Sequence, residues 1–360
     1  MSKVYNFNAG PATLPESVLE KARDEFVDFR GTGMGLIEHS HRGDAFKEVL
    51  AATEADAREI MNLNDEYAVL FLQGGASQQF AMTAMNLALA GKPMLYADTG
   101  SWTSKAIKEA KLFGDVKTVY SGKDSNYTTI GDPNDWDWSG DASYAYMCSN
   151  NTIYGTQYHT LPDTGNTPLI ADMSSDILSR VLDFNKFGVI FAGAQKNLGP
   201  AGVTFVVIRK DLAERAGADV PTMLNYTTHI EKDSCFNTPP VFAIYMVGLV
   251  LQWIKQQGGL KAVQRINETK SDTLYNVIDS SDFYQGTAAP ADRSRMNVTF
   301  RLANTDLESQ FVSEATAAGL VGLKGHRSVG GIRASIYNAM PLAGVSALID
   351  FMNEFERKNG

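Results

Sequence analysis

The stretch YAVLFLQGGASQQFAMTAMNLALAGKPMLYAD, residues 67–98, contains the pattern that decides the fold. A short apolar run of β character (67–72) precedes the small residues GGAS, a helical pattern and a second β run (93–98). The same alternation continues with a helix at 101–113, a strand at 116–120, and apolar runs at 144–148, 168–172, 188–193 and 203–208. Strands that alternate with helices indicate an α/β fold whose mostly parallel sheet is covered on both faces. Ligands bind such sheets at the carboxyl ends of the strands.

Helical patterns flank this region on both sides. Pro15 is placed to open a helix over PESVLEKARDEFVDF, and Asp44 is predicted to cap a second helix that runs to Met61. The run VFAIYMVGLVLQWI (241–254) has 14 residues, which is short for a membrane span and typical of a buried helix.

The end of the chain predicts a second, smaller unit of mixed α and β character. A long helical pattern at 258–278 leads to it, followed by a strand at 296–302 and a helix from about 306 to 318. The strand GGIRASI and a closing helix complete it. We therefore predict a large unit at 1–257 and a small unit at 258–360.

Composition excludes several classes of protein. The 360 residues carry a formal charge of −9, which argues against a general nucleic-acid or anionic-membrane surface. Cys148 and Cys235 are too few for a disulfide framework or a structural zinc site, and no other metal site is expected. The amino terminus lacks the apolar core of a secretory signal, so a cytoplasmic enzyme with reduced thiols is the expectation.

A lysine and an aspartate suggest carbonyl chemistry. Lys196 follows an apolar strand within the small-residue run FAGAQKNLGPAG (191–202). A lysine there can form a Schiff base if its amine is neutral, which burial favours, whereas the alternative is a solvated surface lysine. Asp172 ends the strand PLIAD and could hold the ring nitrogen of pyridoxal in its protonated form. With Ser174 and Ser175 it could equally cap a helix.

Two further features could bind a phosphorylated ring. Gly74 and Gly75 stand between a strand and a helix, where backbone N–H groups at the helix start can bind an anion. The alternative is an ordinary tight turn. Trp102 follows the strand at 93–98 and could stack on a planar ring, although a lone tryptophan is more often part of a core.

Together these residues resemble a known family. The chain is similar to the phosphoserine aminotransferases, class V pyridoxal-phosphate enzymes of fold type I, in the stretches NFNAGPATLP, SHRG, FLQGGAS, GSW, SNNTIYGTQ, ADMSSD, AGAQKNLGPAG, FNTPP and GHRSVGGIRASIYNA. The resemblance runs from about residue 5 to the C-terminus. It implies a large domain with a mostly parallel seven-stranded sheet and a smaller α+β C-terminal domain.

The resemblance also assigns residues to the cofactor, pyridoxal 5′-phosphate. Lys196 would form the Schiff base and carry protons, Asp172 would pair with the ring nitrogen, and Trp102 would stack on the ring. Thr152 would donate to the phenolic oxygen. The residues assigned to the cofactor phosphate are Ala76, Ser77 and Gln195 from the same chain, and Asn237 and Thr238 from the neighbouring subunit. The last pair implies a homodimer with shared active sites.

The substrate groups follow the same resemblance. Arg333 would bind the α-carboxylate, because a guanidinium fork matches a carboxylate. The residues assigned to the distal phosphate or γ-carboxylate are His41, Arg42, His326 and Arg327. Some members of the family carry an arginine in the glycine-rich turn, in the pattern GGGR. This chain has GGAS, so distal-anion binding depends more on those four residues.

The activity implied is a ping-pong transamination between glutamate and 3-phosphohydroxypyruvate that yields O-phosphoserine and 2-oxoglutarate. A related phosphorylated keto acid of vitamin B6 synthesis, 3-hydroxy-2-oxo-4-phosphonooxybutanoate, is a further candidate substrate. A cysteine desulfurase is disfavoured because no cysteine follows Cys235. An alanine–glyoxylate type of transaminase remains open and has no need of a distal-anion pocket. A dehydrogenase is disfavoured because GxGxxG is absent, and a non-enzymatic anion-binding protein would take up no cofactor.

Overall fold

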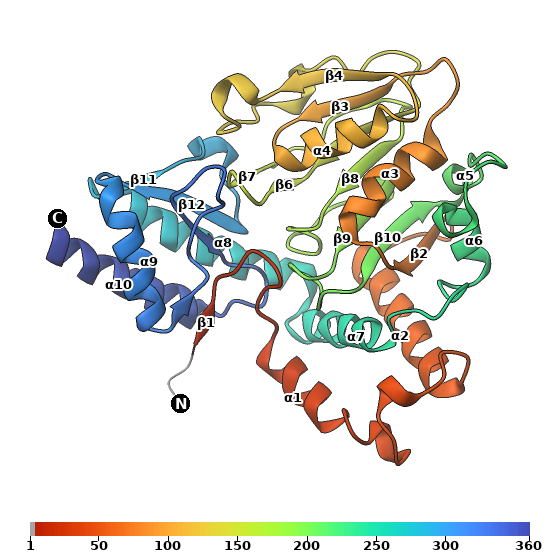
Figure 1. Cartoon of the computed structure of the whole chain (residues 1–360), viewed down its shortest axis with the longest axis horizontal. Coiled ribbons are helices and arrows are strands. Elements are labelled where there is room, and N and C mark those ends of the chain that lie inside the picture. The colour runs from red at the N-terminus through yellow and green to blue at the C-terminus, as the bar shows by residue number, and fades with distance from the viewer. Residues whose placement is uncertain (1–3) are drawn as a thin grey trace.

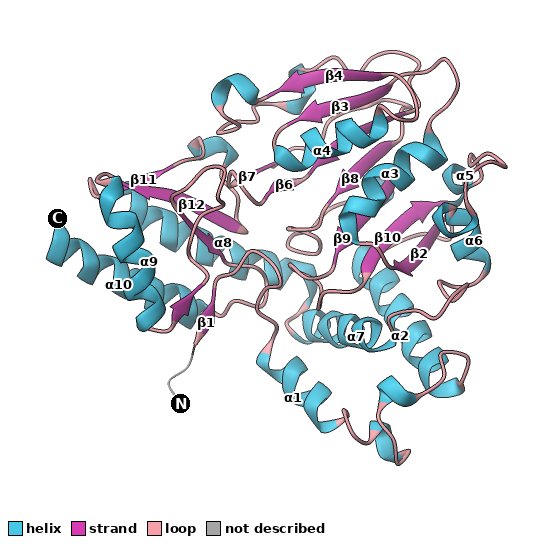
Figure 2. Cartoon of the chain, in the orientation of Figure 1, coloured by secondary structure: helices cyan, strands magenta, loops and turns pink. Residues whose placement is uncertain are grey.

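A seven-stranded sheet forms the centre of the computed structural model, which describes residues 4–360 (Figures 1 and 2). Its strands are β2 (Tyr67–Leu72), β3 (Met94–Asp98), β4 (Val116–Ser121), β5 (Tyr144–Cys148), β8 (Leu169–Asp172), β9 (Phe187–Gly193) and β10 (Thr204–Arg209). Their order is β2-β10-β9-β8-β5-β3-β4. Only β10 runs antiparallel, to both β2 and β9, and every other neighbouring pair is parallel. The predicted seven-stranded, mostly parallel sheet is confirmed.

Helices cover both faces of this sheet (Figure 1). Leu70 and Leu72 pack in one core cluster with side chains of α3 (Gly75–Leu87) and α4 (Ser101–Ala110). Val69 and Phe71 pack in a second cluster with α2 (Asp44–Met61) and α7 (Val241–Gln256). Alternate residues of a strand point to opposite faces, so a continuous apolar run such as β2 is what a sheet buried on both sides requires.

The apolar helix α7 is a core element, as predicted. Its residues Val247, Leu251 and Ile254 are fully buried, and α2 lies along it. Across residues 4–360, no helix combines the length and the apolar character that a membrane crossing requires. Cys148 and Cys235 are both free thiols.

The segment after residue 258 forms its own sheet and core. The helix α8 (Gly259–Asp279) leads into the antiparallel sheet β11 (Tyr284–Gly286), β12 (Asn297–Leu302) and β14 (Ile332–Ser335), which packs with α9 (Glu308–Ala317) and α10 (Leu342–Asn359). Phe7 belongs to the same core cluster, and β1 (Tyr5–Asn6) pairs with β13 (Leu320–Val321). The N-terminal strand thus packs against the C-terminal segment. The division into units at 1–257 and 258–360 stays a prediction, and residues 1–3 lie outside the described part.

Several predicted boundaries were wrong. Asp44 is the first helical residue of α2 and not its cap, because Gly43 occupies that position with extended dihedral angles. The first helix, α1 (Glu16–Asp24), ends earlier than predicted, and the chain then turns to bury Phe29. The elements that the prediction did not contain are short: β1, β13, β6 (Asn150–Asn151), β7 (Thr156–Gln157), β11, α5 (Lys210–Ala213) and α6 (Tyr226–Glu231). Elements of two to six residues carry too little periodicity to be recognised.

Candidate active site

The register of the sheet brings the ends of several strands together. Leu72 of β2 lies opposite Thr204, which lies opposite Gly193 of β9. Asp172, the last residue of β8, lies opposite Phe191 of β9. The segments that follow β2, β8 and β9 therefore leave the sheet at one edge, which is where a parallel sheet binds ligands.

Lys196 lies in the tight turn that follows β9. Its Nζ donates to Thr152 Oγ1 at 2.8 Å and lies 5.1 Å from the centre of the Trp102 ring. The turn packs closely against α7, because a Cβ atom added at Gly199 would lie 2.9 Å from the Val247 side chain. Burial lowers the pKa of the Lys196 amine, while the nearby Asp172 opposes that shift. The predicted lysine is thus a constrained, partly buried amine and not a solvated one.

Asp172 is a buried carboxylate with 4% of its surface exposed. Its Oδ1 accepts hydrogen bonds from the N–H of Ser174 at 2.9 Å and from the hydroxyl of Ser174 at 2.6 Å. Burial raises the pKa of Asp172, and Lys196 and Ser174 oppose this shift. No α-helix begins at Ser174 or Ser175, because residues 174–178 form a turn. Asp172 is therefore not a helix cap. Its Oδ2 has no hydrogen-bond partner among the described residues.

Trp102 lies in the first turn of α4 with its ring face toward two cations. Lys105 Nζ lies 4.4 Å and Lys196 Nζ 5.1 Å from the ring centre. The indole Nε1 is buried and has no hydrogen-bond partner within residues 4–360. An unpaired buried N–H is costly, so it marks a place where a ligand or a water supplies the acceptor.

The glycine-rich turn forms the start of α3. Gly74 precedes the helix with a φ of 89°, and Gly75 begins it with a φ of 68°. Both angles favour glycine. Ala76 is half-buried and Ser77 exposed in the first turn of the helix, whose leading N–H groups have no acceptor within the helix. This geometry suits an anion.

The predicted phosphate ligands from FNTPP lie beside this turn within a single chain. Asn237 Nδ2 donates to Gln73 Oε1, and Gln73 Nε2 donates to the carbonyl of Thr238, both at 3.0 Å. The Gln195 side chain lies against Gly193, where a Cβ atom would come within 2.8 Å of it. Whether Asn237 and Thr238 act on a neighbouring subunit stays a prediction.

Arg333 and His326 line one cavity of about 380 Å³. Arg333 Nη1 donates to the carbonyl of Thr152 at 3.4 Å, and its Nε is buried without a hydrogen-bond partner in the described chain. Burial lowers the pKa of His326, and the positive charges of Arg333 and Arg327 lower it further. The Nδ1 atom of His326 lies 2.7 Å from Ser328 Oγ. Arg327 is exposed next to this cavity. Arg333 lies close to Lys196, because Thr152 contacts both residues.

His41 and Arg42 lie in the loop just before α2. Arg42 is exposed, and its backbone N–H donates to Ser40 Oγ at 3.2 Å. The Nε2 atom of His41 is buried without a partner within residues 4–360. No hydrogen bond in the described chain joins either residue to Lys196 or Arg333.

Sequence reasoning missed the roles of three polar residues, of which it considered Ser174 only as part of a helix cap. Ser174 orients Asp172, and the spacing of an aspartate and a serine two residues later is a recognisable turn signal. Lys105 lies one helical turn after Trp102, and Asn197 bonds to Asn338, more than a hundred residues away. Only the fold brings the last pair together.

Comparisons with known proteins agree with this geometry. The family model of class-V aminotransferases matches residues 4–348. A phosphoserine aminotransferase of Syntrophobacter fumaroxidans is 55% identical over 99% of both chains. The solved phosphoserine aminotransferase of Bacillus circulans subsp. alkalophilus is 50% identical, covers 100% of both chains and superposes with a TM-score of 0.98. A solved PLP-bound phosphoserine aminotransferase of Trichomonas vaginalis is 38% identical, covers 98% of this chain and 100% of its own, with a TM-score of 0.92.

The fold and the site together define a pyridoxal-phosphate-dependent transaminase of fold type I. The chain belongs to the class-V aminotransferase family and, within it, to the phosphoserine aminotransferases.

Proposed function

We propose that this enzyme transfers the amino group of glutamate to 3-phosphohydroxypyruvate, giving O-phosphoserine and 2-oxoglutarate. The observation that carries the proposal is the position of Lys196. Its amine is held by Thr152 over the face of Trp102, and its pKa is influenced by the buried carboxylate of Asp172. A cavity lined by Arg333 and His326 adjoins it.

The residues present fit pyridoxal phosphate. The open acceptor Oδ2 of Asp172 suits a protonated ring nitrogen, the Trp102 face suits a planar ring, and the start of α3 at Gly75 suits a phosphate. Lys196 would hold the cofactor through Nζ, with Thr152 at the phenolic oxygen. When bound, pyridoxal phosphate supplies an aldehyde and a ring that withdraws the electron pair left by removal of the α-proton.

The protein's own groups handle protons and charge. Lys196 takes the α-proton of the amino acid at Nζ, and burial, by lowering the pKa of this amine, favours the neutral form that can accept a proton. Thr152 orients that amine, and Lys196 and Ser174 favour the ionised form of Asp172 by opposing the effect of burial on its pKa. Arg333 binds the α-carboxylate with its guanidinium fork.

The distal anion of each substrate is assigned to His326 and Arg327. These residues lie at or beside the cavity that contains Arg333. Arg327 supplies positive charge on a protein with a formal charge of −9, and the His326 ring supplies a hydrogen-bonding nitrogen. The same site could accept 3-hydroxy-2-oxo-4-phosphonooxybutanoate, which carries a phosphate and an α-keto acid. The glycine-rich turn supplies no cation, because GGAS occupies it.

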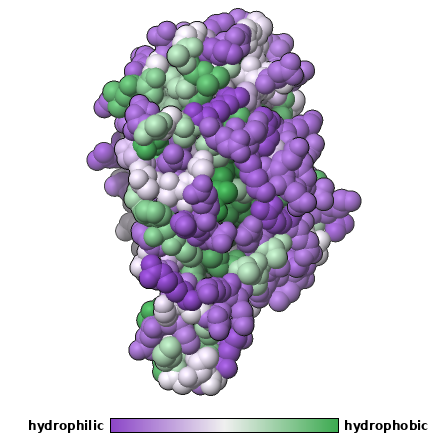
Figure 3. All heavy atoms as spheres, turned by 90° about the vertical axis from the view of Figure 1, so that its right-hand side faces the viewer, coloured by the Kyte–Doolittle hydropathy of each residue, from purple (hydrophilic) through white to green (hydrophobic). Residues whose placement is uncertain are grey.

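We further propose a homodimer in which His41, Arg42, Asn237 and Thr238 of one subunit complete the site of the other. The support concerns His41 and Arg42, because within residues 4–360 no hydrogen bond joins either of them to Lys196 or Arg333. Apolar side chains also gather in patches between polar ones on the face shown in Figure 3. Exposed apolar side chains with 36–77% of their surface accessible occur in the segments 26–37 and 223–236, which precede the two pairs along the chain: Phe26, Val27, Met34, Ile37, Met223 and Phe236. Such surface is typical of a protein interface.

A coupled assay tests the substrate. Glutamate is supplied as donor, and phosphohydroxypyruvate, the vitamin B6 precursor and unphosphorylated keto acids are compared by kcat/KM. Loss of a charge-assisted contact costs about 1.5–3 kcal/mol, so hydroxypyruvate is expected to react about 10- to 150-fold less efficiently than its phosphate. Arg327→Gln should reduce the ratio of kcat/KM for phosphohydroxypyruvate to kcat/KM for hydroxypyruvate. Equal rates with and without the phosphate would contradict the proposed substrate.

A further inference from the structure

Lys270, in the middle of α8, is a buried ammonium group that the proposed reaction does not use. Its side chain has no exposed surface. Its Nζ donates to the carbonyls of Ile336 at 3.0 Å, Tyr337 at 2.7 Å and Met340 at 3.0 Å, with the carbonyl of Asn338 at 3.5 Å. An ammonium group has three N–H donors, and three carbonyls at 3.0 Å or closer match that number.

Among the described residues, no acidic side chain pairs with Lys270. The acidic side chains nearby on α8 pair with other cations, Glu268 and Asp272 with Arg295, and Asp279 with Arg293. Burial lowers the pKa of Lys270 to about 7. Burying a charge is costly, and an apolar side chain of similar volume would avoid that cost. Lys270 nevertheless holds three or four backbone carbonyls of one turn together. Its presence therefore suggests that the shape of the turn at 336–340 is needed for function.

The turn at 336–340 connects Arg333, the proposed ligand of the α-carboxylate, to the turn that carries Lys196. It follows directly after β14, which carries Arg333. Within the turn, the N–H of Asn338 donates to Asn197 Oδ1 at 2.9 Å, and Asn197 is the neighbour of Lys196. Asn197 in turn donates to the carbonyl of Ile177 at 2.6 Å. The turn therefore contacts the element that carries the reactive amine and continues the strand that carries the α-carboxylate ligand.

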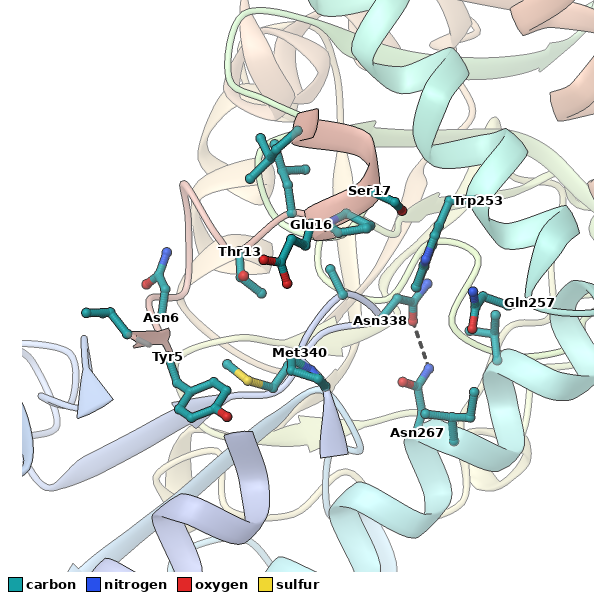
Figure 4. Close-up of a pocket in the computed structure, with 18 residues that line it drawn as sticks. Tyr5, Asn6, Thr13, Glu16, Ser17, Trp253, Gln257, Asn267, Asn338 and Met340 are labelled. Carbon is teal, nitrogen blue, oxygen red and sulfur yellow. Dashed lines mark hydrogen bonds between the residues drawn. The ribbon is translucent and has the colours of Figure 1, made fainter. Parts of the chain in front are cut away.

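A second residue of α8 supports the same turn. Asn267, one helical turn before Lys270, donates from Nδ2 to Asn338 Oδ1 at 2.7 Å, and the two side chains face each other in Figure 4. Asn338 Nδ2 donates to the carbonyl of Leu178 at 2.9 Å. Asn338 thus forms hydrogen bonds with α8 and also with the segments that follow β8 and β9, the second of which carries Lys196.

We infer that Lys270 is a positioning residue for the transamination: its ammonium group fixes the turn at 336–340, so that Asn338 orients Asn197 beside Lys196 while β14 presents Arg333. Lys270 does not touch the substrate or the cofactor. It acts through backbone carbonyls and Asn338, and this inference rests on the proposed function. Removal of the Nζ group leaves three carbonyls without a donor, which allows the turn to move away from Asn197.

The test is the substitution Lys270→Met in the full-length, cofactor-loaded enzyme. Lys210→Met is the matched control, because Lys210 also donates to a backbone carbonyl, that of Asp65 at 2.8 Å, but is exposed. Three quantities are measured: kcat and KM, the pH midpoint at which the visible absorbance of the bound cofactor changes, and the melting temperature. The absorbance midpoint reports the surroundings of Lys196, which a loss of stability alone does not alter.

We expect Lys270→Met to lower kcat/KM by about tenfold or more, the equivalent of one lost hydrogen bond to a charged group, and to move the absorbance midpoint by about half a pH unit or more. Lys210→Met should leave both values as in the wild type. A Lys270→Met enzyme that melts at a lower temperature but keeps the wild-type midpoint and kcat/KM would overturn the inference.

Asn338→Ala keeps the carbonyl partners of Lys270 and serves if Lys270→Met does not fold. It should show the same loss of kcat/KM and the same direction of midpoint shift, and wild-type values for both would also overturn the inference. Failure of the proposed function has a different signature, because the wild type and Lys210→Met would then transaminate no phosphorylated keto acid.

Discussion

Lys196 and Asp172 form a pair of opposite charges in a buried place, and each affects the proton affinity of the other. Burial disfavours the charged form of both, which lowers the pKa of the amine and raises that of the carboxyl group. Their mutual attraction opposes both shifts. The result suits a transaminase, in which an amine must be neutral to act as a base while a carboxylate must keep its charge.

The lowered pKa of Lys196 can be measured in the cofactor-free protein. The amine should react with acetic anhydride at a lower pH than a lysine of ordinary pKa, 10.5, because a lowered pKa yields the neutral nucleophile earlier as pH rises. Lys255 is the internal control, since hydrogen bonds to Asp56 and Glu59 raise its pKa to about 12. Mass spectrometry of the peptides gives both profiles. Labelling of Lys196 at the same or a higher pH than Lys255 would contradict the assignment.

At the scale of elements, the site depends on where strands end and how the next segment begins. The glycine-rich turn shows this best, because Gly74 and Gly75 adopt positive φ angles that let α3 begin directly after β2. The same sheet edge carries Asp172 and the Lys196 turn. A substitution that distorts one of these junctions should therefore weaken cofactor binding more than it destabilises the sheet.

Gly74→Ala tests this junction. The new methyl group would collide with the Gln78 side chain at a φ of 89°, so the start of α3 must move. Gly91→Ala is the control, because Gly91 has a φ of 74° but no neighbouring atom within 4 Å of the new methyl group. Both variants should lose about 1 kcal/mol of stability or more through backbone strain. Only Gly74→Ala should also bind pyridoxal phosphate about tenfold or more weakly. Equal affinity in both variants would show that the turn does not hold the phosphate.

The strands of the central sheet could be predicted because each is a continuous apolar run bounded by small or polar residues. YAVLFL matches β2 at both ends, since a strand buried on both faces has no polar residue to blur its limits. Two-residue strands such as β6 and β7 depend on pairing with each other and leave no local pattern. Lys196 and Asp172 could be proposed from the sequence because they lie at or just after the ends of such apolar strands. The contacts of Lys270 and Asn338 could not. These join residues that only the tertiary fold places side by side.

At the scale of the whole molecule, the open question is how many chains build one site. A single chain brings together Lys196, Thr152, Trp102 and Arg333, whereas in the part of the chain that the structure describes the buried Nε2 of His41 has no hydrogen-bond partner. Symmetric dimers commonly build sites at their interface, where each subunit supplies residues to the other. Shared sites have a consequence that independent sites lack, since two inactive variants can complement each other.

Hybrid dimers test shared sites. Lys196→Ala and the double variant Asn237→Ala/Thr238→Ala are co-expressed with different affinity tags, and the species that carries both tags is isolated. If the pair at 237–238 serves the neighbouring subunit, one of the two sites in each hybrid is intact, and about half of the wild-type activity per dimer is expected. A control hybrid of Lys196→Ala with itself should be inactive. A hybrid no more active than its parents, or a protein that sediments as a monomer, would contradict the shared-site proposal.

The most direct measurement reduces the holoenzyme with borohydride, digests it and maps the peptide that carries the cofactor. One covalent adduct is expected, on Lys196 in the peptide that contains GAQKNLG. The Lys196→Ala enzyme, treated in the same way, should carry none. An adduct on any other lysine of the wild type, or a purified protein that binds no pyridoxal phosphate, would contradict the account.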